Sequence, residues 1–420
     1  MKLNELDLNP VAKVRESTNF TVREIKRVCK NIGPRASGSE NEAKAQEYIK
    51  ENCAKFADTV EQETFTISPR AFMSWPWLCS TILIVSILVF IGAGFVPAAA
   101  VLPMQIVSQA LSLFALLIIL SEFILYHQML DPFFKKATSS NVIFTKKPTG
   151  EVQRRLILSG HMDSAFEWRF TNWGGSKLLR AAIYSAIGSM GVCIVLDFLT
   201  LILRPSDGVL FGFRIAEGVC ILFLTVGFVF DDPKRPVEGA TDDLTGVFSS
   251  LAVLQFLQFN NISFEHTEVM VVSMGSEECG LRGSKFFAKH HSFDDVETVF
   301  IDTDAIHDLE HMGVYSKDLS GTLKHDPQAI ALMQKAGKLA GMDLQAMSLS
   351  LGATDAASMT QAGVKSTAFI AVDPAPARYY HTRRDTAENL DVKAIEKGVE
   401  ILLHASLLFD EQGLRDSYDD

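Results

Sequence analysis

Four long apolar runs, arranged in two close pairs, limit what this chain can fold into more than any other feature. They cover residues 77–96, 104–126, 181–203 and 209–230, and a short turn joins the members of each pair. A helix of about 20 apolar residues crosses the hydrocarbon core of a bilayer. Each run has about that length, so the sequence predicts two membrane hairpins. Buried helices of one large soluble core are the alternative.

The second pair of runs carries three ionisable residues, Asp197, Arg214 and Glu217. Asp197 and Arg214 both lie a few residues from the same turn, so they are expected at similar depth. An isolated charge within a bilayer is costly. We therefore expect these two side chains to pair or to reach toward the membrane surface.

Basic residues flank the two pairs unevenly. The side shared with the rest of the chain carries Arg70, Lys135, Lys136, Lys177, Arg180, Lys234 and Arg235. The connecting turns offer Arg204, with Arg214 just inside the second pair. The excess of positive charge on cytoplasmic loops predicts that both termini and all the polar sequence lie in the cytoplasm. The N-terminal charges precede no continuous apolar core, so no secretory signal is expected there.

Outside the hairpins, about 300 residues alternate between strand-like and helix-like segments, enough for one α/β domain. Such alternation predicts a mixed sheet covered by helices on both faces, in three layers. The hairpins divide this domain. The expected segments are 1–74, 75–130 (first hairpin), 131–178, 179–231 (second hairpin) and 232–420.

Acidic and histidine side chains recur where the predicted strands stop or helices start. One such cluster alone means little, because adjacent carboxylates are usually solvated. Together they favour a shared metal centre, and imidazole and carboxylate ligands suit Zn²⁺ without any thiolate. A net charge of −11 and the lack of a basic stripe exclude nucleic acid as an expected partner. The clusters are His161 with Asp163, Asp242 with Asp243, Glu277 with Glu278, Asp302 with Asp304, and His381.

Seven motifs in one order give the chain a family resemblance. They are "GPRASGSENEAKAQEYI", "SGHMDS", "GATDDLTGV", "GSEECGLRGS", "FIDTDAI", "GATDAASM" and "YHTRRDT". Together they cover nearly all of the sequence outside the hairpins. The chain resembles the co-catalytic zinc aminopeptidases of the bacterial leucyl aminopeptidase and glutamate carboxypeptidase type. The resemblance implies a three-layer zinc-peptidase domain with four transmembrane helices inserted as two hairpins.

The resemblance also implies a binding site for two Zn²⁺ ions. In it, His161 would bind one ion and His381 the other. Asp242 would bridge the two ions, and Glu278 and Asp304 would complete the two sites. Five protein ligands would leave a position for a shared water.

Three further residues receive catalytic roles from the resemblance. Glu277, held beside a ligand but itself unbound, would be the general base. Asp163 would orient His161, and Tyr380 would help to stabilise the oxyanion.

Some positions depart from the family or leave a choice. Asp304 is preferred to Asp302 as the ligand, because "TDAI" fits the family's segment better. Asp355 is present in "GATDAASM", but the histidine that often follows it is replaced by Ala356, so its role stays open. The second hairpin separates the His161 strand from the Asp242 loop; the hairpins either deliver an amphipathic substrate or only anchor the enzyme.

These observations predict a multi-pass membrane enzyme with a cytoplasmic catalytic domain. The expected reaction is zinc-dependent hydrolysis of amide bonds, as an aminopeptidase on short or hydrophobic peptides. One alternative is a deacylase or amidase of N-acyl amino acids or lipopeptides, and another is a non-catalytic membrane scaffold. A single-zinc cyclase is less favoured, because the full set of five ligands points to two metals. The expected partners are a peptide or amphipathic amide substrate and the lipid bilayer; no oligomeric state is predicted.

Overall fold

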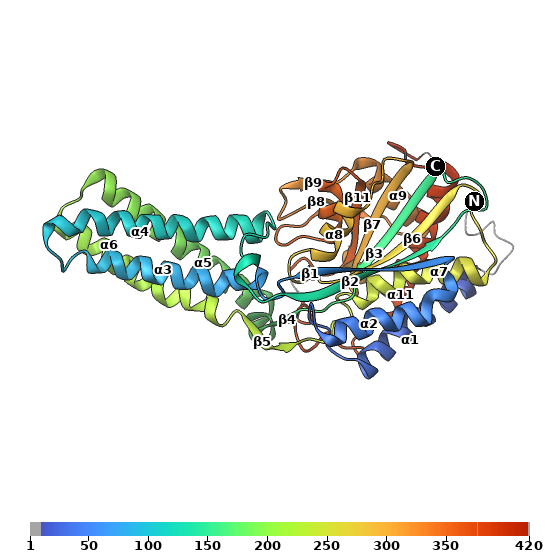
Figure 1. Cartoon of the computed structure of the whole chain (residues 1–420), viewed down its shortest axis with the longest axis horizontal. Coiled ribbons are helices and arrows are strands. Elements are labelled where there is room, and N and C mark those ends of the chain that lie inside the picture. Colours follow the sequence, from blue (N-terminus) through green and yellow to red (C-terminus); the bar gives the residue numbers. More distant parts are fainter. Residues whose placement is uncertain (1–9, 376, 419–420) are drawn as a thin grey trace. The chain divides into compact units, whose positions relative to one another are not determined.

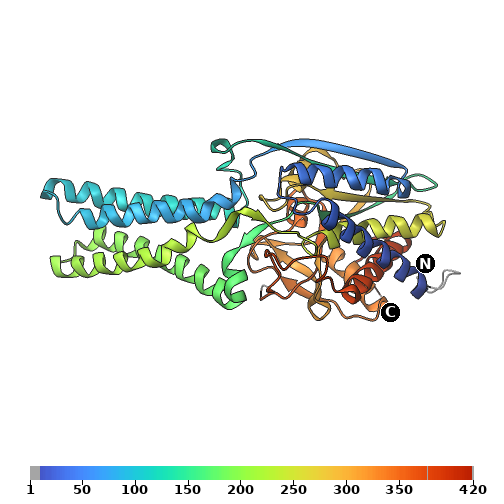
Figure 2. The same cartoon turned by 90° about the horizontal axis from the view of Figure 1, so that it is seen from below.

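The computed structural model describes residues 10–375 and 377–418. The chain forms two compact units (Figures 1 and 2). The sheet unit comprises Met1–Pro69, Lys135–Phe166 and Arg235–Asp420. The helical unit comprises Arg70–Phe134 and Glu167–Lys234, the two segments in which the hairpins are expected.

The sheet unit contains one nine-stranded mixed sheet. Its strands are β1 (Thr59–Ile67), β2 (Ala137–Lys146), β3 (Arg154–His161), β6 (Thr267–Met274), β7 (Glu297–Ile306), β8 (Met312–Asp318), β9 (Leu323–Lys324), β10 (Gln345–Ser348) and β11 (Lys365–Ala371). They lie in the order β1-β2-β6-β3-β7-β11-β8-β10, with β9 against β8. At the centre, β6, β3, β7 and β11 run parallel, so their carboxyl ends meet at one edge.

Side chains alternate between two cores on the two faces of the sheet. In β3, Leu156 and Leu158 pack into one core and Ile157 into the other, as the two-residue period of a strand requires. One face is covered by α1 (Pro10–Asn31), α2 (Glu40–Cys53), α7 (Leu244–Phe259), α9 (Pro327–Leu339) and α11 (Val392–Gln412). The other face is covered by α8 (Arg282–His290) and α10 (Asp355–Gln361). The predicted three-layer α/β fold is confirmed (Figure 1).

The helical unit consists of two helical hairpins (Figures 1 and 2). Its helices are α3 (Trp75–Gly92), α4 (Ala98–Ile118, continued by a π-helical segment Ile119–Ile124), α5 (Arg169–Leu203) and α6 (Asp207–Leu224). α5 contains a kink at Gly175, whose φ of +63° favours glycine. The strands β4 (Phe166–Trp168) and β5 (Asp231–Pro236) form a separate two-stranded sheet. Short 3-10 turns lie at Ala54–Phe56, Phe72–Ser74, Asp131–Phe133, Thr225–Phe228 and Leu309–His311.

Four helices of this unit are long and apolar enough to cross a membrane, within the described part of the chain. They span Phe72–Gly92, Ala98–Ile124, Arg169–Leu203 and Asp207–Phe228. Their outer surface is apolar: large side chains such as Leu88, Leu117, Phe198 and Leu222 are about half exposed or more. An apolar surface of this extent is unusual for a protein in water, and the four helices are candidate membrane spans.

The interior of the helical unit contains buried polar side chains beside its apolar core, and their contacts correct one expectation. Asp197 does not pair with Arg214; its carboxylate accepts hydrogen bonds from Ser108 and Ser112 of α4. The Arg214 guanidinium instead lies against Gly94, in the connection between α3 and α4. The expectation considered only the α5–α6 turn, whereas the nearest partners of Asp197 come from the other hairpin.

Candidate metal centre

Three parallel strands bring the predicted ligands to one edge of the sheet. His161 is the last residue of β3, Glu277 and Glu278 follow β6, and Asp304 lies near the end of β7. The loop before α7 supplies Asp242. His381 arrives from the loop between β11 and α11.

The ligand atoms form three groups, and the group of His161, Glu277 and Glu278 shares one residue with each of the other two. Asp242, Glu278 and His381 offer one atom each within 4.8 Å of one another. His161 and Asp304 form a second group of the same size with Asp243. The five residues that the resemblance implies as ligands therefore converge on one place, split into a His381 side and a His161 side.

Asp242 lies between the two histidines. Its Oδ1 is 3.1 Å from Nε2 of His161, and its Oδ2 is 3.1 Å from Nε2 of His381. Each oxygen of one carboxylate thus faces a different imidazole. A carboxylate in this position can place one oxygen on each of two cations.

The described donors fit zinc in type and in spacing. Two imidazoles and three carboxylates belong to the ligand types of Zn²⁺. Ligand atoms bound at zinc distances in a tetrahedron lie about 3.3 Å from one another. The two 3.1 Å separations around Asp242, and the 3.3 Å between His381 Nε2 and Glu278 Oε1, are close to that value. Glu278 Oε1 is also buried and accepts no hydrogen bond, which leaves it available for a metal.

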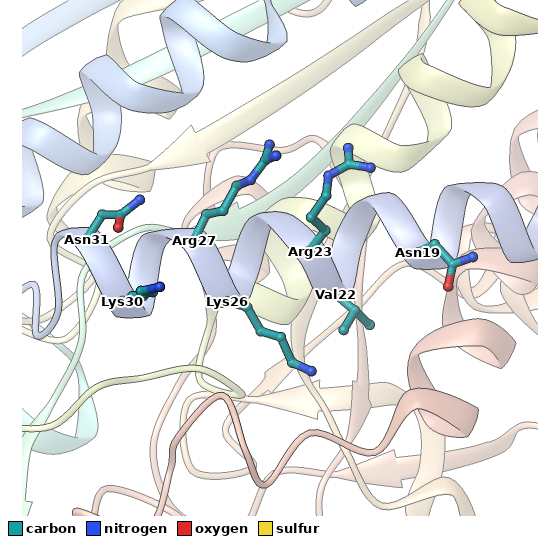
Figure 3. A pocket seen from close by; sticks show the side chains of 7 residues that line it. All are labelled: Asn19, Val22, Arg23, Lys26, Arg27, Lys30 and Asn31. Carbon is teal, nitrogen blue, oxygen red and sulfur yellow. The ribbon is translucent and has the colours of Figure 1, made fainter.

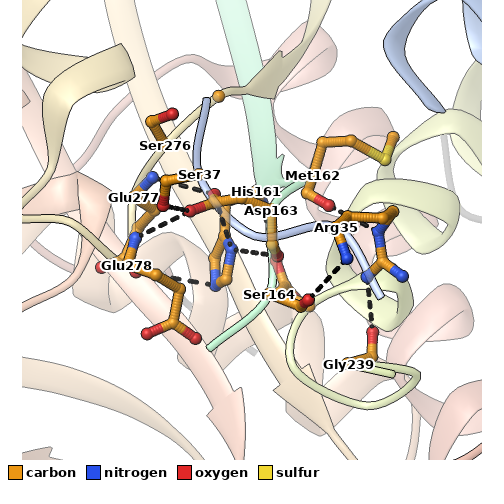
Figure 4. A network of polar contacts seen from close by, with 12 residues as sticks. Arg35, Ser37, His161, Met162, Asp163, Ser164, Gly239, Ser276, Glu277 and Glu278 are labelled. Atoms are coloured by element: carbon orange, nitrogen blue, oxygen red, sulfur yellow. Dashed lines mark hydrogen bonds and ion pairs between the residues drawn. The ribbon is translucent and has the colours of Figure 1, made fainter. Parts of the chain in front are cut away.

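Asp163 fixes the loop that carries the two glutamates (Figure 4). Its carboxylate accepts hydrogen bonds from the backbone N–H groups of Glu277 and Glu278, at 2.9 and 3.1 Å, and from the Ser37 hydroxyl at 2.6 Å. It also lies 3.4 Å from Nδ1 of His161. Asp163 is therefore placed to orient His161, as predicted. Its carboxylate also holds the loop that carries Glu277, the predicted general base.

Glu42 supports the same loop from α2. It is buried, and its Oε1 accepts hydrogen bonds from Ser276 and Ser139. Ser276, directly before Glu277, has a φ of +56°, a conformation that costs energy for any residue except glycine. The hydrogen bond to Glu42 helps to hold this strained turn, and the turn sets the direction of Glu277.

Arg35 connects three loops behind the site (Figure 4). Its side chain is fully buried. The guanidinium donates hydrogen bonds to the carbonyls of Met162, Glu238 and Gly239, at 2.7, 2.6 and 2.8 Å. The loop after β3 carries Asp163, and the loop before α7 carries Asp242. The Arg35 guanidinium therefore holds the backbone of both loops in place.

Burial and mutual repulsion alter the pKa values at the site. Burial raises the pKa of Glu277 well above its usual range, and the charges of Glu278 and Asp355 raise it further. Burial also raises the pKa of Glu278 to about 7. Burial acts in the same direction on Asp242, but hydrogen bonds with His161 and His381 outweigh it and lower the pKa. A bound cation favours the ionised form of such carboxyl groups, so a concentration of buried acids suits a metal site.

The remaining predicted residues lie at or beside this centre. Tyr380 stacks on His381, with ring centroids 4.0 Å apart, and burial raises the pKa of its phenol well above the usual range. Asp302 accepts a hydrogen bond from Ser159 at 2.6 Å, whereas Asp304 belongs to the His161 group. Asp355 is buried, and burial raises its pKa to about 8. The individual roles of these residues stay predictions.

Several supporting residues were not assigned from the sequence. Asp243 accepts hydrogen bonds from the N–H groups of His161, Gly246 and Ala305. Asp385 accepts bonds from the N–H groups of Thr241 and Asp242. Both residues lie inside motifs that carry the family resemblance, so the motifs indicated that these positions belong near the site. Their hydrogen bonds join segments far apart in the sequence, which no local pattern reveals.

Among the cavities along the described part of the sheet unit, two are considered as ligand sites. One, of about 470 Å³, runs along α1 and is lined mainly by basic and amide side chains, so it offers no carboxylate for a metal (Figure 3). The other, of about 540 Å³, borders the loop of His381. Its lining residues are Arg378, Tyr379, Arg384, Thr386, Glu388 and Asn389.

Comparisons with known proteins agree with this site. Residues 225–406 match the model of peptidase family M28. This segment contains Asp242, Glu277, Glu278, Asp304 and His381. No curated protein matches the chain.

Solved structures with the same fold include peptidases and cyclases. A leucine aminopeptidase precursor from Bacteroides thetaiotaomicron has a TM-score of 0.54 at 12% identity, with 92% of this chain and 96% of that chain covered. A glutaminyl cyclase from the same organism gives the same values. The zinc aminopeptidase BSAP from Bacillus subtilis has a TM-score of 0.52 at 14% identity, with 96% and 95% covered. At such low identity these similarities establish the fold alone.

The family match covers the segment that carries most of the converging acids, and the fold agrees with the implied zinc-peptidase architecture. Over residues 225–406 the chain is therefore similar to peptidase family M28, and its fold is that of zinc aminopeptidases, in agreement with the resemblance drawn from the motifs.

Proposed function

We propose that this protein is a membrane-embedded aminopeptidase that uses two zinc ions to hydrolyse short or hydrophobic peptides. One observation carries the two-metal part of the proposal: the two oxygens of Asp242 face His161 and His381 at equal distances of 3.1 Å. A centre for one metal would not need a carboxylate placed between two histidines.

In the proposed site, His161 and Asp304 would hold one ion, His381 and Glu278 would hold the other, and Asp242 would offer one oxygen to each. The ions would supply Lewis acidity for the scissile carbonyl and for a water. Glu277, whose Oε2 lies 3.8 Å from Nε2 of His161, would accept a proton from water and donate it to the leaving amine. The Tyr380 hydroxyl donates a hydrogen bond to the developing oxyanion.

The proposal places the hairpins in a bilayer and the peptidase domain on its cytoplasmic side. Four described helices that are long, apolar and covered by exposed apolar side chains support the first point. The excess of Lys and Arg next to the outer ends of the hairpins supports the second. Protease accessibility in sealed vesicles tests it: a cleavage site engineered into the turn at 204–206 and one near the C-terminus are expected on opposite sides.

Metal removal is expected to abolish turnover reversibly. A chelator should inactivate the detergent-solubilised protein, and zinc should restore activity because the ligands are supplied by a folded sheet edge. Elemental analysis of the reactivated protein should give about two zinc ions per chain. A fully active protein with one bound zinc contradicts the two-metal proposal.

Substrate choice is expected to depend on a free α-amino group. Acetylation of one peptide should lower kcat/KM by about 100-fold or more, because a site that binds a polar group discriminates strongly against its loss. Preference for the acylated form would instead support a deacylase or amidase. Peptides beginning with glutamine test the reaction of the cyclase neighbours: release of ammonia with no peptide cleavage would overturn the aminopeptidase proposal.

A further inference from the structure

Two neighbouring residues at the end of β7, His307 and Asp308, join the loop of His381 to the sheet. They follow directly after Ile306, the last residue of β7. Their backbone N–H groups both donate to the Ala371 carbonyl at the end of β11, at 3.0 and 2.6 Å. Neither residue belongs to the ligand groups of the candidate metal centre. We call the pair His307 and Asp308 the clasp.

The Asp308 carboxylate holds the chain that precedes His381. Its Oδ2 accepts hydrogen bonds from the backbone N–H of Asp373 at 2.9 Å and from the Tyr379 hydroxyl at 2.7 Å. Tyr379 lies two residues before His381. Burial alone would raise the pKa of Asp308, but hydrogen bonds with His307 and Tyr379 outweigh it and lower the pKa to about 2. The carboxylate is therefore ionised at neutral pH.

The His307 imidazole faces an oxygen acceptor at each of its two nitrogens. Nδ1 lies 2.9 Å from Oδ1 of Asp308, and Nε2 lies 2.7 Å from the backbone carbonyl oxygen of Asn389. A carbonyl oxygen and an ionised carboxylate can only accept, so both nitrogens must carry a proton for both bonds to form. The geometry is that of an imidazolium ion. It holds the chain that follows His381, because Asn389 lies between His381 and α11.

We propose that His307 and Asp308 are positioning residues for His381, and that the clasp holds the loop fully only while the His307 ring carries both protons. Asp308 bonds the chain before His381 and His307 bonds the chain after it, so the clasp fixes the loop on both sides. Loss of one ring proton breaks a hydrogen bond of His307 and removes the positive charge beside Asp308. The inference rests on the proposed function, because it takes His381 as a zinc ligand.

The groups around the clasp favour the protonated ring. Burial alone would lower the pKa of His307, but hydrogen bonds with Asp308 and Asn389 outweigh it and raise the pKa. The titratable groups that surround the clasp are Asp308 itself, Tyr379, whose ring centroid lies 4.2 Å from that of His307, Asp391 at the start of α11, and Asp373 with His311 at 3.9 Å.

The raised pKa of His307 sets the direction of the pH dependence. A histidine whose pKa is raised by folding contributes its full stabilisation below the unfolded value of about 6.5. That contribution is lost as the pH rises through the pKa of the folded state. The clasp is therefore expected to hold the loop at mildly acidic pH and to release it at alkaline pH.

Hydrogen exchange in the zinc-loaded, detergent-purified full chain tests the clasp through two backbone amides, without any substrate. The Asp373 amide donates to the Asp308 carboxylate, and the Thr382 amide donates to the Tyr379 carbonyl at 2.9 Å. Protection factors, corrected for intrinsic exchange, are compared at about pH 6 and about pH 8.5, on either side of a raised histidine pKa. In the wild type, both amides should be about tenfold less protected at the higher pH, because a hydrogen bond between charged groups is lost.

His307→Gln removes the titrating ring, so both amides should show the lower protection at both pH values. Its zinc affinity, measured by competition with a chelator, should be about tenfold lower, as is usual when a group that positions a metal ligand is lost. His266→Gln is the matched control. His266 also places a ring nitrogen against a backbone carbonyl, that of Glu151 at 3.1 Å, but it lies before β6, and this variant should respond like the wild type.

Wild-type protection that stays the same at both pH values would overturn the proposal, and this measurement needs no variant. An equal fall in the wild type and in His307→Gln would also overturn it. Unchanged zinc affinity in His307→Gln would contradict the positioning of His381. The expected protection and zinc affinities in a protein that hydrolyses no peptide would support the clasp and refute the proposed function, so the two failures are distinguishable.

Discussion

Glu277→Gln is expected to keep both zinc ions and to lose turnover by a factor of about 10² to 10⁴, the usual contribution of a general base. Glutamine has nearly the same size and keeps the backbone N–H that Asp163 accepts at 2.9 Å. It cannot take a proton from water. The loop, the ligands and the fold should therefore survive the substitution, while kcat falls and KM changes little.

Glu278→Gln is the matched control for this prediction, because it changes the neighbouring residue in the same chemical way. Glu278 lies 3.3 Å from His381 and within the group of Asp242. Its substitution should lower zinc content as well as activity. Elemental analysis beside the kinetic assay distinguishes the two outcomes. A Glu277→Gln protein with wild-type turnover, or one that has lost its zinc, would remove the base assignment.

The second large effect is expected at Arg35 and concerns stability. Arg35→Met should cost about 4 kcal/mol or more of local unfolding free energy. The substitution removes a fully buried guanidinium, leaves the carbonyls of Met162 and Glu238 without this donor, and leaves the Gly239 carbonyl only the Leu244 N–H at 3.5 Å. Hydrogen bonds to charged groups contribute about 1.5–3 kcal/mol each, and an unpaired buried carbonyl adds a desolvation penalty.

Hydrogen exchange of the amides in β3 and α7 measures this effect, because both elements adjoin loops that Arg35 holds. Arg15→Met is the control. Arg15 is exposed and lies 3.7 Å from Glu396, so its loss should change stability by less than about 1 kcal/mol. If the β3 amides are equally protected from exchange in the Arg35 and Arg15 variants, the buried guanidinium does not contribute to the stability of this region.

The fold was predictable because its signals are local. The strand "RRLILSGH" and the strand "TEVMVVSM" are short runs rich in apolar and β-branched residues, and alternation of strands with helices indicated the covered sheet. The meeting of His161 with Glu278 followed from strand ends, since parallel strands place their carboxyl ends together. The four candidate membrane spans were also predictable from local sequence, because each is one continuous apolar run.

The side-chain contacts that could not be predicted join residues far apart in the sequence. The contacts of Asp163 with Ser37 and of Ser108 with Asp197 join residues separated by 126 and 89 positions. Nothing in the residues themselves specifies such partners, because any buried carboxylate can accept from many donors. Asp197 shows the consequence: its sequence neighbours suggested Arg214, and the packing of α4 supplied serines instead.

The position of α5 and α6 between β3 and β6 has a consequence for how the protein is made. β3 pairs with β6 and β7 on its two sides, and both are synthesised only after the second hairpin. On the ribosome, both edges of β3 therefore stay unpaired while α5 and α6 are synthesised. Long-range pairing of this kind is slow and exposes strands to aggregation. The nascent chain is thus expected to need a chaperone until translation has passed β7, and only then can this edge of the sheet assemble.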